Sequence, residues 1–396
     1  MKYKNLILAI LLLYSCSQIN NDLNLYRIEK DDLYGFIDKQ GKVVIQTQFD
    51  YVSNFSENFA YARKDSIYGF IDKSGKFRIE FKFKQENDSS LFSSFLSRPT
   101  IEILNKLESL SYSFSGDKTR KLKVFPEIEE IRFVNGLCPF YDEKSKKYGF
   151  IDKKGVFIIE PKFESAFPFS EGLAVIQIGD KYGYINTEGE IVIECVYDKA
   201  NPFNCNRAVC NFSKSENQEL DGKDVPFFSA NVVVIDKSGS IINAPQGFTV
   251  IRDFSQNLAI KVDFAKMLTT GRGLTFIDDE LNSKTEYFFQ DAKDFSEDWA
   301  AIEINDKWGF LNADFQTIID LEFDNVQSFH DSLAPVKTNG AWGFINNTGE
   351  LVIENKYDTV SVFNNNLAYV VYNDNGFKIE GYIDESGRMI WYKETH

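Results

Sequence analysis

The sequence of 396 residues holds only two histidines, His330 and His396, and this scarcity restricts the chemistry available to it. A Ser-His-Asp or Cys-His site would have to use one of them as its base. His330 takes the serine position of a recurring turn, and His396 is the last residue. The sequence also lacks a glycine-rich phosphate loop, an H-E-x-x-H string and an EF-hand string. We therefore expect no catalytic residues of these kinds, no cofactor and no metal.

Cysteine is scarce as well, with five residues in the chain. No C-x-x-C string is present, so a zinc site is not expected. Cys138 stands where other repeats carry alanine, which is typical of a small core residue. Cys195, Cys205 and Cys210 could form disulfides in an exported protein. The four cysteines other than Cys16 allow three pairings, and their spacing does not choose among them.

Long hydrophobic runs are absent, and the run Leu6–Leu13 is too short to cross a bilayer as a helix. Lys2 and Lys4 precede this run, and Ser15 and Cys16 follow it, which is the layout of an export signal. An uncleaved N-terminal anchor and a plain signal peptide are the alternatives. No later stretch is long and apolar enough to cross a membrane.

The string Leu13-Tyr14-Ser15-Cys16 resembles a bacterial lipoprotein lipobox, although Tyr14 is bulkier than the small residue usual there. This resemblance implies cleavage before Cys16 and acylation of that cysteine, with residues 1–15 as signal peptide and 16–24 as tether. Ser17 would favour the outer membrane in a Gram-negative cell. The prediction is a cell-envelope protein held at the membrane through its N-terminal lipid only.

Positive charge is in deficit, with 44 Lys and Arg against 59 Asp and Glu and a net charge of -15. Loss of residues 1–15 removes two lysines and no acid, and gives -17. A body this acidic repels phosphate backbones, so nucleic acid is not an expected partner.

The most prominent feature of the sequence is a recurring unit. Three pairs of glycines, 35 and 69, 149 and 183, and 309 and 343, are each 34 residues apart. Each glycine follows an aromatic residue and precedes an aromatic, an aliphatic and an Asp or Asn. A fixed period in this range is the signature of a repeat architecture. The aromatic–glycine pairs are Tyr34-Gly35, Tyr68-Gly69, Tyr148-Gly149, Tyr182-Gly183, Trp308-Gly309 and Trp342-Gly343.

Within a unit, three short apolar runs separated by turn residues predict three β-strands. The turn Asn186–Gly189 has Asn at its first position and Gly at its fourth, and D-x-x-G recurs at this place in other units. A tight hairpin explains these acids without a ligand. A second anchor follows: an aromatic 14 residues after each glycine and, for all of them but Gly69, a phenylalanine six residues later and then Leu-Ala or an equivalent.

Some units depart from the pattern. Val233 and Thr275 replace the central glycine, and Glu380 takes an aromatic position. Leu281 and Phe315 replace the turn glycine, and we expect altered turns there. Nine units run from residue 25 to the C-terminus, with insertions near 84–128, 211–230 and 264–273 that we expect to form loops. The stretch 99–107 has the spacing of a short helix.

These units resemble the WG repeat, also called the KWG repeat, of bacterial proteins. Lys307-Trp308-Gly309-Phe310-Leu311-Asn312 matches its core, and Phe169-Ser170-Glu171-Gly172-Leu173-Ala174 matches its trailing element. Most units carry tyrosine where the family has tryptophan. The resemblance implies an all-β repeat domain, often on exported or surface proteins, that mediates binding. It implies no catalytic residues.

The sequence therefore predicts an all-β chain, a tandem array of about nine three-stranded modules over residues 25–396. An open, curved, solenoid-like path is favoured because three strands per unit and nine units both differ from the usual propeller. A closed, propeller-like ring is the alternative.

The predicted function is that of a binding or scaffold module at the cell envelope, with a protein or a glycan as ligand. A carboxylate-based polysaccharide hydrolase and a purely structural envelope protein are the alternatives. Recurring acids and aromatics are interpreted as structural, because an active site is usually unique. Possible ligand contacts are therefore sought where the pattern breaks, at Trp299, Trp391, Phe227 and Phe228.

Overall fold

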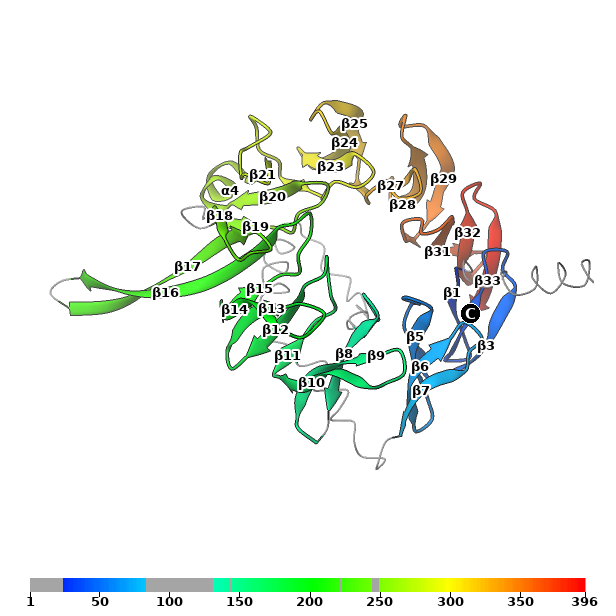
Figure 1. Ribbon diagram of the computed structural model, residues 1–396. Coiled ribbons are helices and arrows are strands. Elements are labelled where there is room, and N and C mark those ends of the chain that lie inside the picture. Colours follow the sequence, from blue (N-terminus) through cyan, green and yellow to red (C-terminus); the bar gives the residue numbers. More distant parts are fainter. Residues whose placement is uncertain (1–23, 83–130, 143, 221–222, 244–248, 396) are drawn as a thin grey trace, which may run out of the picture.

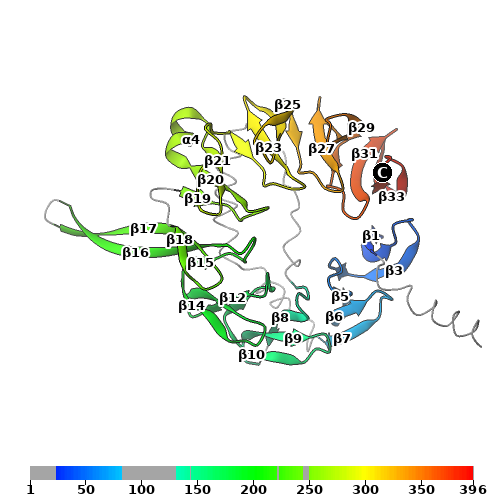
Figure 2. The same cartoon turned by 45° about the horizontal axis from the view of Figure 1, so that its top comes forward.

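The computed structural model describes residues 24–82, 131–142, 144–220, 223–243 and 249–395, and they form nine small antiparallel sheets. The sheets stand one after another around a ring, and the last lies beside the first (Figures 1 and 2). The favoured open path was therefore wrong, and the alternative of a closed ring is confirmed. The rotation between units is set by how sheets pack, which the repeat spacing does not encode. The predicted signal segment with Cys16 and the insertion 84–128 lie outside the described residues.

We call the sheets blades 1 to 9. Blade 1 contains β1 (Tyr26–Lys30), β2 (Leu33–Ile37) and β3 (Val43–Phe49); blade 2 contains β4 (Tyr51–Val52), β5 (Phe59–Lys64), β6 (Ile67–Asp72) and β7 (Phe77–Lys82); blade 3 contains β8 (Leu137–Asp142), β9 (Lys147–Asp152) and β10 (Phe157–Phe163). Blade 4 contains β11 (Ser165–Ala166), β12 (Ala174–Ile178), β13 (Lys181–Ile185) and β14 (Ile191–Tyr197); blade 5 contains β15 (Lys199–Ala200), β16 (Ala208–Leu220), β17 (Lys223–Ile235) and β18 (Ile241–Asn243). Blade 6 contains β19 (Thr249–Ile251), β20 (Leu258–Asp263) and β21 (Leu274–Asp278), with helix α4 (Phe264–Thr270) between the last two.

The remaining blades follow the same plan. Blade 7 contains β22 (Asp291–Ala292), β23 (Trp299–Ile304), β24 (Lys307–Asn312) and β25 (Thr317–Phe323); blade 8 contains β26 (Asn325–Val326), β27 (Leu333–Thr338), β28 (Ala341–Asn346) and β29 (Leu351–Tyr357); blade 9 contains β30 (Thr359–Val360), β31 (Leu367–Asp374), β32 (Phe377–Asp384) and β33 (Met389–Thr395). Six blades thus have a fourth strand of only two residues, which is too short to leave a pattern in the sequence.

Strand order places the two edges of each blade. In blade 4 the order is β11-β12-β13-β14, so the short strand and the last strand are the two edges. The last strands, such as β10, β14 and β29, lie on the outside of the ring (Figure 1). The short strand is therefore the inner edge. Burial agrees with this, since β12 begins with three buried residues and β14 exposes several of its side chains.

The central glycine lets the last strand cross the one before it. A Cβ on Gly183 would lie 2.5 Å from the carbonyl oxygen of Ile193, because β14 bulges over this point. No side chain fits at that distance, so only glycine is tolerated. The crossing carries the chain at once into the next blade, and the same contact recurs at Gly35, Gly149, Gly309 and Gly343.

Two blades lack the central glycine. In blade 5 Val233 takes its place, and β18 keeps a bulge opposite Val234 and Ile235. In blade 6 Thr275 takes its place, and the last strand is reduced to two isolated bridges, Leu274–Phe289 and Ile277–Ser283. The Thr275 hydroxyl bonds that of Thr285 at 2.8 Å. Blades 2 and 9 keep the glycine and its close approach to a carbonyl oxygen of the last strand, at Gly69 and Gly381.

The turn glycines form the contacts between neighbouring blades. A Cβ on Gly189 would touch the side chain of Ile159 in the preceding blade, and Gly41 lies in the same way against Ile390 across the end of the ring. The expected altered turns at Leu281 and Phe315 were wrong. Both residues keep the turn hydrogen bond and adopt the glycine-like φ of 67° and 59°.

The expected loops at two insertions were also wrong. Residues 211–220 and 223–230 belong to β16 and β17, which pair over 13 positions and project from the ring as an arm (Figures 1 and 2). Within 264–273 lies α4, which begins after the N-cap Asp263 and ends at Gly271 with φ 70°. All four cysteines of the described residues, Cys138, Cys195, Cys205 and Cys210, are free thiols.

Candidate functional site

The recurring serine of the trailing element joins one blade to the next. Its hydroxyl donates to the backbone carbonyl of the phenylalanine that opens the same element in the following blade. The distance is 2.7 Å from Ser56 to Phe133 and 2.6 Å from Ser170 to Phe203, and Ser255 and Ser296 repeat the bond at 2.7 Å. This serine is therefore a structural residue.

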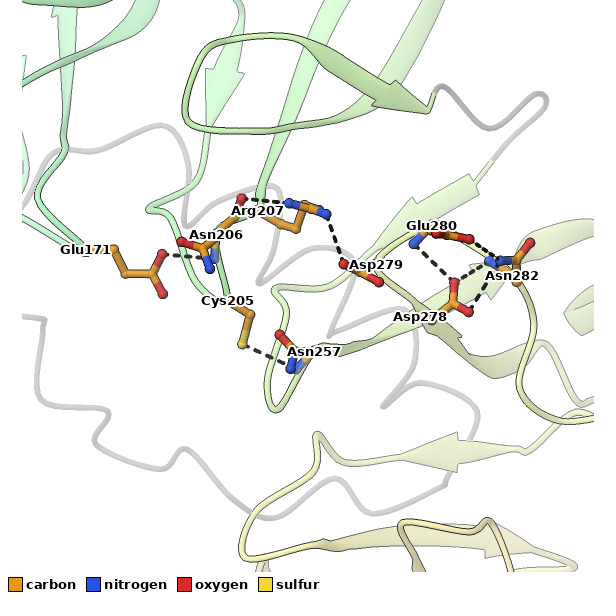
Figure 3. A network of polar contacts seen from close by, with 9 residues as sticks. All are labelled: Glu171, Cys205, Asn206, Arg207, Asn257, Asp278, Asp279, Glu280 and Asn282. Carbon is orange, nitrogen blue, oxygen red and sulfur yellow. Dashed lines mark hydrogen bonds and ion pairs between the residues drawn. The ribbon is translucent and has the colours of Figure 1, made fainter.

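The residue after this serine forms a second link. The Glu171 carboxylate accepts the backbone N–H of Asn206 in the next blade at 2.9 Å, and Glu297 accepts those of Asp331 and Ser332. The bonds continue from turn to turn around the ring. In blade 5 a thiol takes this role, since Cys205 Sγ accepts the N–H of Asn257 at 3.3 Å (Figure 3). The carboxylates of this element thus serve packing between blades.

The remaining recurring acids also form hydrogen bonds or ion pairs. Asp72 caps its hairpin turn by accepting the backbone N–H of Ser74 at 2.8 Å. The lysine before the aromatic–glycine pair binds the acid that follows the next anchor, as Lys307 binds Asp324 at 2.8 Å. That hydrogen bond lowers the pKa of Asp324. This geometry agrees with the structural interpretation of the repeated carboxylates.

The repeated aromatics face the last strand of their own blade. Trp308 lies opposite Phe323 and Trp342 opposite Tyr357, and both tryptophans are buried. Tyr148 is buried, whereas Tyr34, Tyr68 and Tyr182 are half buried. These rings therefore form part of the core of the ring wall.

The predicted ligand contacts have varied surroundings. Trp299 is half buried, with its ring 5.4 Å from that of Phe329 in the next blade. Trp391 is half buried against the cluster that joins blades 9 and 1. Phe227 and Phe228 lie in β17, but the description does not extend to their side chains. A role for any of them in ligand contact stays a prediction.

Three acids outside the repeat pattern behave differently. Asp253, Asp294 and Glu303 have raised pKa values, and partial desolvation is the main cause for each. Acids with structural bonds have lowered values instead, as at Asp72, Asp142, Glu164, Glu171, Asp236, Asp324, Glu380 and Asp384. The raised values lie in the adjacent blades 6 and 7.

Asp253 and Asp294 occupy the same place in adjacent blades. Each follows the inner short strand by two residues and directly precedes a buried phenylalanine, Phe254 or Phe295. Both side chains reach solvent. Each is preceded by a base, Arg252 or Lys293. A row of alternating charge thus lies along the inner edge of two blades.

Direct contacts and charge join this row across three blades. The Asp253 carboxylate accepts a hydrogen bond from the Asn201 amide of blade 5 at 2.7 Å. The Arg252 guanidinium donates to the backbone carbonyl of Ala292 in blade 7 at 2.7 Å. After desolvation, Arg252 lowers the pKa of Asp294 and Asp253 raises it, so the charges of both residues act on this carboxyl. We call Asn201, Arg252, Asp253, Lys293 and Asp294 the inner polar row.

Sequence reasoning missed the inner polar row because it tracked the residues that recur. The signal was present: Arg252-Asp253 and Lys293-Asp294 are two base–acid pairs at one register, just before the phenylalanine of the second anchor. Alignment of the degenerate units on that phenylalanine would have shown it.

A second departure from the repeat lies nearby, between blades 5 and 6 (Figure 3). Arg207 stands at the position that carries leucine in several other blades, and its guanidinium binds Asp279 at 2.9 Å. Its Nε is buried without a hydrogen-bond partner. This ion pair replaces apolar packing at that joint.

The described parts of the chain contain no group of three or more His, Cys, Asp or Glu side chains that could hold a metal ion. None of the helices within them has the length and apolar character needed to cross a membrane.

Comparison with known families gives one match. A family model described as "WG containing repeat" matches residues 34–66, 68–85, 148–182, 182–209, 288–308, 308–340 and 342–375. The unmatched stretch 210–287 holds the two degenerate units and Asp253. No curated protein matches the chain.

Solved structures show only distant likeness. Oligogalacturonate lyase from Vibrio parahaemolyticus is 10% identical over 64% of this chain and 88% of its own, with a TM-score of 0.34. The Pan2 WD40 domain of Neurospora crassa is 10% identical over 60% and 80%, with a TM-score of 0.29. The extracellular domain of a putative one-component system from B. thetaiotaomicron is 9% identical over 96% and 55%, with a TM-score of 0.28. At these TM-scores none of the three bears on function.

Proposed function

Because this chain belongs to the family of WG-containing repeat proteins, we propose that it is a binding scaffold of the cell envelope whose inner polar row takes an uncharged glycan. The observation that carries the proposal is that recurring polar residues and those of the inner polar row have different surroundings. Those that recur make contacts within and between blades, whereas the inner polar row lies outside the pattern and its two carboxylates, Asp253 and Asp294, are exposed.

The chemistry of the row suits hydroxyl groups. Asp253 and Asp294 accept hydrogen bonds, Arg252 and Lys293 donate them, and Asn201 does both. The charges alternate along the row, so neither sign dominates a ligand that spans it. The net charge of -15 disfavours a polyanion. An uncharged chain of sugars meets these conditions, and an extended peptide of a protein partner is the competing ligand.

Location is part of the proposal. The N-terminal segment has the layout of a lipoprotein signal, so the body is placed at the envelope by a lipid on Cys16. Labelling of living cells with a palmitate analogue tests this. Label should enter the wild-type chain and be absent from Cys16→Ser. Equal labelling of the two proteins would contradict the anchor.

A glycan array tests the ligand. The body is prepared with Cys16→Ser and compared with Asp253→Ala/Asp294→Ala. The matched control is Asn54→Ala/Ser328→Ala, since these residues directly precede the same phenylalanine in blades 2 and 8. We expect the site variant to lose at least about tenfold of the binding to uncharged glycans, and the control to keep it. No binding by the wild type, or equal loss in both variants, would refute the glycan proposal.

A hydrolase is the second candidate, and the raised pKa values of Asp253 and Asp294 favour it. A glycosidase needs a general acid whose pKa is raised. Incubation of the wild type with each bound glycan distinguishes the two functions. Intact glycans indicate binding alone, whereas cleavage that Asp294→Asn abolishes indicates catalysis.

A further inference from the structure

The joint between blades 9 and 1, which we call the seam, lacks the chain crossing found at most other joints. Blade 1 passes to blade 2 within one residue, since β3 ends at Phe49 and β4 begins at Tyr51. At the seam, β33 stays paired with β32 as far as Lys378 and Thr395. Within the described residues no strand of blade 9 pairs with a strand of blade 1. Noncovalent contacts between the two blades therefore close the ring.

Blade 9 also replaces an aromatic pair with an ion pair. In blades 7 and 8 the tryptophan before the central glycine lies opposite an aromatic of the last strand. In blade 9 Glu380 takes the position of the tryptophan, and Lys393 lies opposite it. The Lys393 ammonium lies 3.3 Å from the Glu380 carboxylate and 3.3 Å from that of Glu29 in blade 1. Lys393 thus bridges an acid of the last blade and an acid of the first.

Further polar contacts support this bridge. The Tyr369 hydroxyl donates to Glu380 at 2.9 Å, and Lys378 also pairs with Glu380. Side-chain exposure is 14% for Glu380 and 20% for Lys393, so these charges are mostly withdrawn from water. Loss of one member would leave the others poorly compensated.

The apolar part of the seam is small. Its cluster holds four buried residues, Tyr26, Ile28, Ile37 and Leu367, and is the smallest of the nine clusters in the described part of the chain. The cluster at the joint of blades 7 and 8 holds ten. Two tyrosine hydroxyls add bonds across the seam, from Tyr26 to the Asn365 carbonyl at 2.5 Å and from Tyr382 to the Arg27 carbonyl at 2.8 Å. Ionic contacts therefore contribute a larger part of the stability of the seam than of the joint between blades 7 and 8.

We propose that the seam is an ionic latch, in which Lys393 bound between Glu29 and Glu380 holds the ring closed, and that the ring opens at this joint when the latch is released. The Glu29 side chain is 36% exposed, so salt at high concentration screens the Glu29–Lys393 pair, whereas it does not weaken an aromatic contact. The seam is thus the joint whose closure depends on ionic strength.

Pulsed electron paramagnetic resonance on the whole chain tests the latch. Spin labels on introduced non-natural residues avoid the native cysteines. One pair of labels replaces Asp32 and Asn375, which lie in equivalent hairpin turns of blades 1 and 9. The control pair replaces Asp306 and Asn339, in the corresponding turns of blades 7 and 8. At low salt both pairs should give one narrow distance distribution.

Three comparisons decide the outcome. At about 1 M salt the seam pair should gain a second, longer distance while the control pair stays unchanged. Lys393→Met should show the longer distance at low salt, and Glu380→Trp, which restores the aromatic of other blades, should stay narrow at high salt. If Lys393→Met does not fold, the salt series on the wild type decides alone. A seam distance that salt and variants leave unchanged, or equal broadening at the control joint, would overturn the proposal.

Discussion

The ring of Phe315 packs 5.8 Å from that of Phe276 in the neighbouring blade, although Phe315 holds a turn position that is glycine in seven other blades. Its φ of 59° is strained for a residue with a side chain. In blade 6 the smaller Thr285 stands at the position of the isoleucine on which turn glycines rest elsewhere. The phenylalanine fills that space.

We therefore predict that Phe315→Gly destabilises the protein, even though it relieves strain. Loss of a packed aromatic costs about 3 kcal/mol, and relief of the backbone returns about 1 kcal/mol. Urea unfolding should show a net loss of about 2 kcal/mol. Asn tolerates this φ, so Phe315→Asn should give a similar loss. A gain in stability for Phe315→Gly would show that the ring contributes no packing.

Gly183→Ala tests the strand crossing. The added Cβ would meet the Ile193 carbonyl oxygen at 2.5 Å, and backbone on both sides limits relaxation. We expect a loss of about 3 kcal/mol. Gly172→Ala is the control from the same blade, because it has φ 86° but nothing within 4 Å of the new Cβ. It should cost about 1 kcal/mol. Equal costs would contradict a close approach at Gly183.

Cys205→Gln tests the bonds between turns. The thiol is a weak acceptor for the Asn257 N–H, whereas Gln256 at the same position of the next blade accepts the Asp298 N–H through its amide oxygen. Glutamine at 205 should raise the free energy of unfolding by about 0.5 kcal/mol. Cys205→Ala serves as control and should give no gain. The idea fails if the two variants have the same stability in thermal unfolding.

Asp294→Asn tests the desolvation of the inner polar row. A raised folded-state pKa means that the folded protein binds the proton more tightly, so stability falls as pH rises from the ordinary value of 3.8 through the raised value. The neutral variant should therefore be more stable than the wild type at pH 7 and show a flatter profile in that window. Asp324→Asn should do the opposite, since its lowered pKa contributes stability above the ordinary value. Urea unfolding from pH 3 to 8 distinguishes the two.

Much of the fold was predictable from the sequence, because the 34-residue period is the length of one β-sheet unit. The spacing of Gly149 and Gly183 gave the length of a blade, and the turn residues gave its hairpins. Closure of the ring was not predictable, because it depends on how Gly41 of the first unit meets Ile390 of the last. Contacts over that sequence separation leave no local signal.

The inner polar row was not predicted from the sequence, because its residues do not recur. A search for recurring residues finds those that hold blades together, such as Ser170 and Glu171, and passes over Asp253 and Asp294. The desolvation of these two carboxyls arises from neighbouring blades, which only the fold brings around them. The turn at Phe315 was mispredicted for a related reason, since the gap that it fills exists only in the assembled ring.

Recurring residues hold the ring together, and we propose that the inner polar row holds the ligand. Calorimetric titration with a glycan selected on the array, paired with thermal unfolding, tests both halves on the same proteins. We predict that Asp253→Ala/Asp294→Ala binds at least about tenfold more weakly with an unfolding midpoint no lower than that of the wild type. Asp324→Asn should unfold about 1 °C lower with unchanged affinity. Unchanged affinity in the first variant, or an equal loss of affinity in both, would contradict the account.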